Sequence, residues 1–331
     1  NKAYLDSILI TYPTDTYDYY IFNYTQDIAS ATQISIIEDV VKSTIEYPVR
    51  LMYSTTTNAG YPTTAFGDNV IGKLSRSMNI FGEEQLELDV LSDKIIQEEC
   101  GENPYVGLLA SEELPDEIKI SDGEYGVCYD PLDGSSLVDV NLAVGSIFGI
   151  YKTGSFIGVK GTDMIAAMAS VYGPRTTITL TIGDGVAEFV RCEDGDFKLQ
   201  NDSIKVGEGK MFAPGNLRAC AYRDDYMKLT EYWIREEYVL RYSGGMVPDV
   251  NQILLKGKGI FSYPGYEKAP DGKLRLLFEC APLSFIMEQA GGASTDGKVR
   301  ILEKEVESLD QRTPIYIGSK EEVNRCEEYL A

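Results

Sequence analysis

An apolar run that leads directly into two aspartates and a Gly-Ser-Ser turn constrains this chain more than any other feature. Tyr125, Val127, Cys128 and Tyr129 are typical of a buried strand, and Asp130-Pro131-Leu132-Asp133-Gly134-Ser135-Ser136 follows them. Carboxylates at this spacing can hold hard divalent cations, and the amides of the turn can surround an anion. The segment therefore predicts a metal ion and a phosphate side by side, as metal-assisted phosphoester hydrolysis requires. A simple strand-ending turn is the competing interpretation.

The charge of the chain limits its partners. The 331 residues include 30 lysines and arginines against 52 aspartates and glutamates, a net charge of −22. Such a surface repels nucleic acid and anionic membranes, so we expect neither as a partner. No apolar stretch approaches the ~18 residues that a membrane-spanning helix needs. A phosphate site in this chain would need local positive charge from metal ions or a few arginines and lysines.

The absence of histidine removes several catalytic schemes. Ser-His-Asp and Cys-His catalysis and every histidine-containing zinc site are excluded. The six cysteines are scattered without a Cys-x-x-Cys pair, so we expect reduced, mostly buried thiols in a reducing compartment. This predicts a cytoplasmic protein. Because the chain begins at Asn1 without Met, a plastid location after removal of a leader stays open.

Strands alternate with helices along the chain, which predicts a layered α/β fold. Periodicity and end signals predict helices over 25–46, 162–172, 224–236 and 282–290, and a last helix that opens at the capping-box spacing Ser319-Lys320-Glu321-Glu322. Residues 85–99 are expected to form a short strand or helix start followed by an amphipathic helix, and 54–69 a loop. Strands are expected over 106–110, 125–129, 142–151, 176–182, 186–191, 259–263 and 273–279. A composition break at 207–214 suggests two packed α/β halves, 1–203 and 204–331.

Further acidic residues stand where elements begin or end. They are Glu83, Asp89, Glu112, Glu113 and Glu279. Each alone is more typical of a solvated end. If they gathered with the two aspartates, each like-charged pair at ~4 Å would cost on the order of 1 kcal/mol in water and more inside a protein. Bound cations would have to neutralise such a cluster, and ligands that are all oxygen favour Mg²⁺ or Mn²⁺.

At these residues the chain resembles the sugar bisphosphatases of the fructose-1,6-bisphosphatase fold family. Residues 130–136 match the metal–phosphate motif of that family, and Glu112-Glu113, Asp89 and Glu279 fall where its other metal and base residues lie. The resemblance implies a layered αβαβα sugar-phosphatase fold with mixed sheets, and Mg²⁺-dependent hydrolysis of a sugar bisphosphate.

Several stretches resemble the sedoheptulose-1,7-bisphosphatase branch of the family: 172–177, 207–218 and 241–252. Others, 261–264 with 273–275, resemble the fructose enzymes. The resemblance therefore implies removal of the 1-phosphate of sedoheptulose 1,7-bisphosphate, with a fructose-1,6-bisphosphatase or a dual-specificity enzyme as the alternative. An inositol-phosphatase-like role leaves the arginines and lysines of a second phosphate site unused. A non-enzymatic metabolite sensor is the alternative of a different class.

The resemblance also implies roles for individual residues. Two or more Mg²⁺ ions per subunit, for which Mn²⁺ can substitute, would be held by Glu83, Glu112, Glu113, Asp130, Asp133, Glu279 and the Leu132 carbonyl. Asp89 and Glu113 would orient and deprotonate the attacking water. The reacting phosphate would be bound by Asp133, Gly134, Ser135 and Ser136, with Arg275 nearby. The far phosphate and the sugar would be bound by Asn216, Arg218, Tyr242, Met246, Tyr263 and Lys273. Arg241 would reach into the site of a neighbouring subunit, which implies a homodimer, with a tetramer as the alternative.

The chain departs from the family pattern at a few positions. Glu83 stands where the family has aspartate. No cysteine precedes Cys100, so the redox-switching pair of the plant enzymes is absent. Glu124 and Lys152 replace a lysine and an arginine of the AMP site in fructose-1,6-bisphosphatases, so AMP inhibition is not expected.

Overall fold

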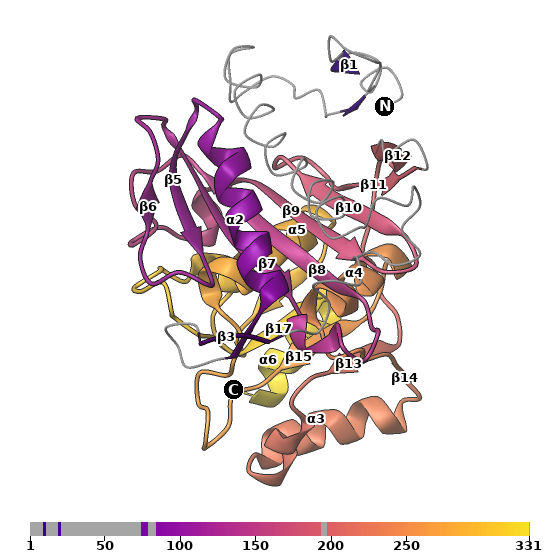
Figure 1. Ribbon diagram of the computed structural model, residues 1–331. Helices are drawn as coiled ribbons and strands as arrows, with labels where there is room; N and C mark the ends of the chain where they lie inside the picture. The colour runs from indigo at the N-terminus through magenta and orange to yellow at the C-terminus, as the bar shows by residue number, and fades with distance from the viewer. Residues whose placement is uncertain (1–8, 11–18, 21–73, 79–83, 193–196, 331) are drawn as a thin grey trace.

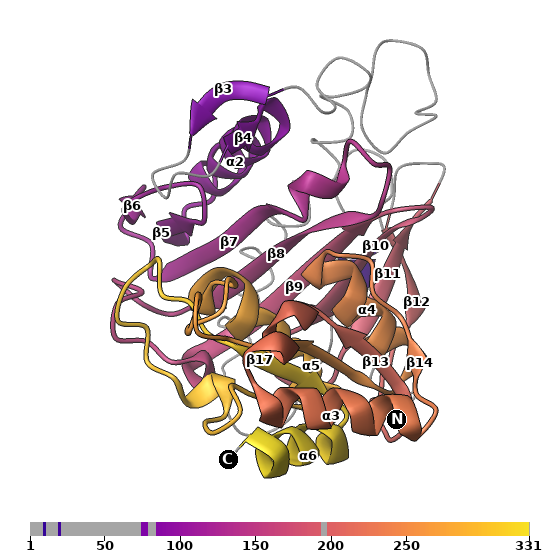
Figure 2. The ribbon, with the colours of Figure 1, turned by 90° about the horizontal axis from the view of Figure 1, so that it is seen from below.

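The computed structural model describes residues 9–10, 19–20, 74–78, 84–192 and 197–330. Within these ranges the elements stack in five layers, with helices between and outside two mixed β-sheets (Figure 2). This arrangement confirms the layered αβαβα fold that the sequence predicts. No helix in the described ranges is both long and apolar enough to span a bilayer. The expected helix 25–46, the expected loop 54–69 and Glu83 lie outside the described residues.

The first sheet has eight strands and carries the Asp-rich segment. Its order is β12-β11-β10-β9-β8-β7-β5-β6, and all neighbours are antiparallel except β5 and β7. Every residue of β5, β7 and β8 is buried, because layers cover both faces of the sheet. The strands are β5 (Val106–Ser111), β6 (Ile118–Lys119), β7 (Tyr125–Asp133), β8 (Val144–Tyr151), β9 (Met164–Tyr172), β10 (Thr176–Thr181), β11 (Ala187–Arg191) and β12 (Phe197–Asn201).

The second sheet has five strands in the order β14-β13-β15-β17-β16. Strand β13 pairs in parallel with β14 and β15, and β17 pairs antiparallel with β15 and β16. The expected boundary between residues 203 and 204 lies on the connection from β12 to β13. The strands are β13 (Met211–Pro214), β14 (Val239–Leu240), β15 (Ile260–Tyr263), β16 (Ala293–Thr295) and β17 (Ile315–Gly318).

The helices between the sheets, α4 (Met246–Lys256) and α5 (Ala281–Gln289), share one core with both of them. Ile147 of β8, Val250 of α4, Ile286 of α5 and Ile317 of β17 are all fully buried in that core. Pro282 stands in the first turn of α5, as expected, where its missing N–H costs no helical hydrogen bond. The two halves of the chain are therefore packed through a common layer.

The outer layers consist of helices and short segments. Helix α2 (Glu87–Gly101) covers the outer face of the first sheet, and α3 (Asp224–Arg235) and α6 (Lys320–Leu330) cover that of the second (Figures 1 and 2). Two small sheets pair β1 (Leu9–Ile10) with β2 (Tyr19–Tyr20) and β3 (Leu74–Met78) with β4 (Glu84–Leu86). Short 3₁₀ turns are η2 (Ser135–Leu137), η3 (Gly161–Asp163), η4 (Leu217–Ala221) and η6 (Ile301–Glu303).

Most predicted elements are confirmed, but the helix expected over 162–172 is wrong. Met164–Tyr172 forms the central strand β9. Ala167 and Ala169 face the core between the sheets, whereas Ala166 and Met168 face the core beneath the outer layer. Because both faces are buried, the segment lacks the polar alternation that marks a half-exposed strand.

The strand expected over 273–279 is also wrong. Arg275 makes a single bridge with Arg312, and Leu276–Cys280 then form the π-helical turn η5, which runs directly into α5. The Cys280 N–H donates to the Arg275 carbonyl at 2.9 Å, the i→i+5 bond that defines such a turn. All five residues of the turn are buried, and its apolar residues Leu276, Leu277 and Phe278 resemble those of a buried strand.

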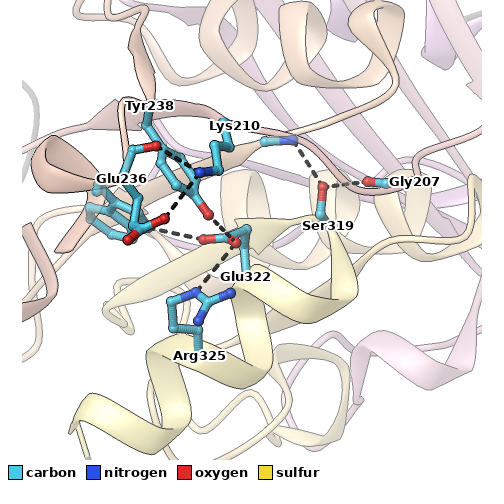
Figure 3. A network of polar contacts seen from close by, with 9 residues as sticks. Gly207, Lys210, Glu236, Tyr238, Ser319, Glu322 and Arg325 are labelled. Carbon is cyan, nitrogen blue, oxygen red and sulfur yellow. Dashed lines mark hydrogen bonds and ion pairs between the residues drawn. The ribbon is translucent and has the colours of Figure 1, made fainter.

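Helix α6 begins where the capping-box spacing predicts, but its two capping side chains bond elsewhere. The Ser319 hydroxyl donates to the Gly207 carbonyl at 2.5 Å (Figure 3). The Ser319 N–H, which a capping box would pair with Glu322, donates to the Gly259 carbonyl at 2.8 Å. The buried Glu322 carboxylate instead accepts hydrogen bonds from Trp233 Nε1 (3.0 Å) and Tyr238 Oη (2.7 Å) (Figure 3). Glu322 therefore joins α6 to α3 and to the segment before β14.

Candidate active site

Acidic side chains from four segments line one cavity of about 320 Å³. These segments are α2, the end of β5, β7 and η5, and they contribute Asp89, Glu112, Glu113, Asp130, Asp133 and Glu279. Asp130, Asp133 and Glu279 each place one carboxylate oxygen within 4.8 Å of those of the other two. Glu83, the seventh acidic residue expected, lies outside the described residues.

A β-bulge in β7 points both aspartates toward this cavity. Asp130 pairs with Ile147 and Asp133 with Gly145, so β7 holds one more residue than β8 between the two pairs. In a regular strand, residues three apart face opposite sides of the sheet, and the extra residue restores them to one side. Pro131 fits the bulge because it has no N–H to pair. Both aspartates were expected to follow the strand, but β7 continues through Asp133.

Asp133 also contacts the second half of the chain. Its Oδ2 accepts the Val247 N–H at 2.7 Å, in the first turn of α4. Burial raises the pKa of Asp133 to about 7, and the hydrogen bond from Val247 opposes part of that rise. Gly145, opposite Asp133 on β8, leaves room for Val247, whose Cγ1 would lie 2.4 Å from an added Cβ.

The pKa values of Asp130 and Glu279 are both well above their usual range. Burial is the main cause for each, and the neighbouring Glu112 and Asp133 carboxylates add to it. Arg275 stands behind the carboxylates with 2% of its surface exposed, its Nε 3.5 Å from Glu112 Oε1 and its backbone N–H donating to Glu279. One guanidinium cannot balance so many carboxylates, so the cluster is charged only if further cations neutralise it.

The donor chemistry of the cluster fits a hard divalent cation. All its side-chain donors are carboxylate oxygens, and the Leu132 backbone also lines the cavity. Such a set suits Mg²⁺ or Mn²⁺ and not zinc, which prefers nitrogen and sulfur ligands. Asp130, Asp133, Glu279 and Glu112 are the residues that could hold it.

The wall beside the cluster has the properties of an anion site. Gly134 adopts a left-handed backbone (φ 78°), which leads from β7 into the short turn η2. Gly134, Ser135 and Ser136 line the cavity next to Asp133. The remaining lining residues are Tyr242, Gly244, Met246, Phe261, Tyr263, Lys273 and Leu274, and they form a second wall. Lys273 brings positive charge to it.

Four residues expected at the site do not line this cavity. The amide of Asn216 donates to the Pro264 carbonyl at 2.8 Å, next to Tyr263, so it braces that wall. Arg218 is exposed, and its charge counteracts the rise that burial causes in the pKa of Tyr242. Arg241 is exposed, and Arg275 lies behind the carboxylates.

Sequence reasoning missed Asp249, a fully buried carboxylate of α4. It accepts the N–H groups of Ser243 (2.9 and 3.0 Å) and Gly244 (3.3 Å), and the amide of Gln252 (3.2 Å). These bonds fix the loop between Tyr242 and the start of α4. One feature of the sequence could have identified Asp249. It stands in the first turn of a helix that begins after Gly244-Gly245, where an acidic side chain is favoured.

Comparison with known proteins gives two matching family models. The fructose-1-6-bisphosphatase N-terminal domain matches residues 40–202, and the C-terminal domain matches residues 206–331. A class 1 fructose-1,6-bisphosphatase of Geotalea uraniireducens is 49% identical over 256 residues, covering 76% of this chain and 81% of the relative. The chloroplastic sedoheptulose-1,7-bisphosphatase of Triticum aestivum is 47% identical over 258 residues, covering 76% and 65%. The crystal structure of Leishmania major fructose-1,6-bisphosphatase superposes with a TM-score of 0.80 at 30% identity, over 91% of this chain and 95% of that one.

Proposed function

Since the chain belongs to the fructose-1,6-bisphosphatase family and is a sugar bisphosphatase, we propose that it removes the 1-phosphate from sedoheptulose 1,7-bisphosphate in a Mg²⁺-dependent reaction. The observation that carries the proposal is the convergence of Asp130, Asp133 and Glu279 beside the Gly134–Ser136 turn. That convergence supports a cation next to a phosphoryl group.

The carboxylates divide the work of hydrolysis. Asp130, Asp133, Glu112 and Glu279 would hold two or more Mg²⁺ ions, and Glu83 and the Leu132 carbonyl would complete the ligand set. Bound Mg²⁺ would neutralise phosphoryl charge and acidify the attacking water. Asp89 and Glu113 would orient that water for in-line attack and accept its proton.

The turn after β7 holds the reacting phosphate. The backbone N–H groups of Gly134, Ser135 and Ser136 and the two serine hydroxyls are donors for its oxygens. Arg275, behind Glu112, stabilises the ionised carboxylates and does not contact the phosphate.

The wall formed by Tyr242, Tyr263 and Lys273 binds the far phosphate, with Arg218 at its exposed edge. The Met246 backbone contacts the sugar, and Asn216 fixes the segment that carries Tyr263. Binding at the far phosphate orients the substrate, so a sugar monophosphate should react poorly.

The alternative substrate is fructose 1,6-bisphosphate, alone or together with the seven-carbon sugar. The bacterial relative named as a fructose-1,6-bisphosphatase and the plant relative named for sedoheptulose have similar identity to this chain. Phosphate release from each bisphosphate in Mg²⁺, compared as kcat/KM, tests the proposal. A large preference for the six-carbon sugar would reject sedoheptulose 1,7-bisphosphate as the main substrate.

We also propose a homodimer in which Arg241 of one subunit reaches the site of the other. Arg241 is exposed and follows the edge strand β14, whose Val239 and Leu240 are exposed apolar residues. An exposed apolar edge strand is an unfavourable feature for a monomer.

A further inference from the structure

A buried polar cluster lies directly behind the candidate catalytic carboxylates, and its members have no role in the mechanism above. It consists of Asp93 on α2, Tyr129 on β7 and Ser111 at the end of β5. Tyr129 and Ser111 are fully buried and Asp93 is 7% exposed. Three polar groups enclosed in this way must satisfy one another's hydrogen bonds.

Asp93 is the acceptor at the centre of the cluster. The Tyr129 hydroxyl donates to its Oδ1 at 2.9 Å, and the Gln97 amide donates to its Oδ2 at 2.5 Å. Burial raises the pKa of Asp93, and a hydrogen bond from the Ser111 side chain opposes that rise. Because Tyr129 and Gln97 donate to different oxygens, a group with two acceptor oxygens is needed at position 93.

The cluster reaches the active site through Ser111. The Ser111 hydroxyl oxygen accepts the Glu113 N–H at 3.2 Å. The Glu112 N–H donates to the Tyr129 carbonyl at 3.1 Å. The backbone of both glutamates is thus tied to residues of the cluster, and α2, which carries Asp93, also carries Asp89 one turn earlier.

We propose that Asp93 is a positioning residue, which acts through Ser111 and Tyr129 to fix Glu112 and Glu113 relative to Asp89. The inference rests on the proposed function, because it names residues that orient the groups of that site. A misplacement of about 1 Å at such groups is enough to lower turnover by about 100-fold.

The test compares Asp93→Asn and Ser111→Ala with the parent protein and with Ser294→Ala. Ser294 is a matched control, since it is also a buried serine that hydrogen-bonds a carboxylate, but it lies on β16 and does not line the cavity. Phosphate release in saturating Mg²⁺ gives kcat and KM. Hydrogen exchange of the segment 108–116, followed by mass spectrometry without substrate, gives the order of the Glu113 amide.

We expect Asp93→Asn and Ser111→Ala to lower kcat by roughly tenfold, to leave KM within about twofold, and to speed exchange at Glu113, while Ser294→Ala keeps parental kcat and exchange. A merely structural role would lower the melting temperature of all three variants without changing kcat per folded molecule. Unchanged kcat and unchanged exchange in both cluster variants would overturn the inference.

If Ser111→Ala does not fold, Tyr129→Phe takes its place. A parent protein that hydrolyses neither bisphosphate would reject the proposed function instead, and the exchange measurement would still test the positioning.

Discussion

Asp133 is the residue whose surroundings most change its chemistry. Burial raises its pKa in the folded protein to about 7, far above the usual value of 3.8. A carboxyl whose pKa is raised by folding binds its proton more tightly in the folded state, so it favours folding at low pH and loses that contribution as pH rises to the folded pKa.

We therefore expect the metal-free protein to lose stability between about pH 4 and 7 relative to Asp133→Asn, by on the order of a few kcal/mol. The Asn variant cannot ionise, so the difference between the two reports the ionisation of Asp133 together with its effect on Asp130 and Glu279. Urea denaturation in EDTA at pH 5, 6, 7 and 8 measures it, and added Mg²⁺ at pH 8 should restore the parent more than the variant. A pH-independent difference would contradict the pKa assigned to Asp133.

Replacing Lys273 tests whether the wall that carries it binds the far phosphate. If its charge contributes equally to binding the substrate and the transition state, Lys273→Ala should raise KM about tenfold or more with kcat within about threefold. Steady-state kinetics with the bisphosphate measures both constants, and Lys268→Ala on the same exposed segment is the control. A fall in kcat at constant KM would move Lys273 to the reacting phosphate.

The carboxylates and the Gly-Ser-Ser turn that line the cavity were recognisable from their own chemistry, whereas Tyr242, Met246, Tyr263 and Lys273 were expected only from the family resemblance. The sequence could not show how Asp130 and Asp133 come to share one side of a strand. That depends on the bulge opposite Ile147 and Gly145, which is a property of the pairing between β7 and β8. The role of Asp249 depends in the same way on a loop conformation that no residue pattern specifies.

At the scale of elements, the contact of α6 with α3 depends on Glu322. Glu322→Ala removes the acceptor of Trp233 Nε1 and the Tyr238 hydroxyl, so we expect it to lower the free energy of unfolding by roughly 2–4 kcal/mol. Glu321→Ala, an exposed position on the same helix, should change it by less than about 0.5 kcal/mol. Urea denaturation of both variants measures the difference. Equal stabilities would mean that the buried carboxylate contributes nothing.

The two misassigned elements have the same cause. Residues 164–172 and 276–280 are buried on all sides, so neither shows a polar face from which a period could be read. Helices α3 and α6 keep one polar face toward solvent, and their positions were predicted correctly. Enclosed elements need another signal, as Pro282 in the first turn and the glycine pair after the helix provide for α5.

At the scale of the whole molecule, the edge of the second sheet predicts self-association. Ile234 at the end of α3 and Val239 and Leu240 on β14 are each more than half exposed. We expect a homodimer that Leu240→Lys converts to a monomer with lower activity, because the edge and Arg241 would no longer meet the second subunit. Light scattering after size-exclusion chromatography measures the mass, with Val299→Lys as an exposed control elsewhere. A monomeric parent at micromolar concentration would contradict the dimer.

The layered architecture itself was predictable, because it follows from the alternation of strands and helices. The shared middle layer was expected only from the family resemblance, since no residue pattern in α4 or α5 shows that each contacts both sheets.

The shared layer has a consequence for any attempt to divide the protein. Asp130 and Asp133 belong to the fragment before residue 203, whereas Glu279 and the Val247 amide belong to the fragment after it. A nick in the connection from β12 to β13 would leave neither piece with a complete set of ligands. If the site binds Mg²⁺ as proposed, divalent ions would add to the shared core in holding the two pieces together, and a chelator would weaken their association.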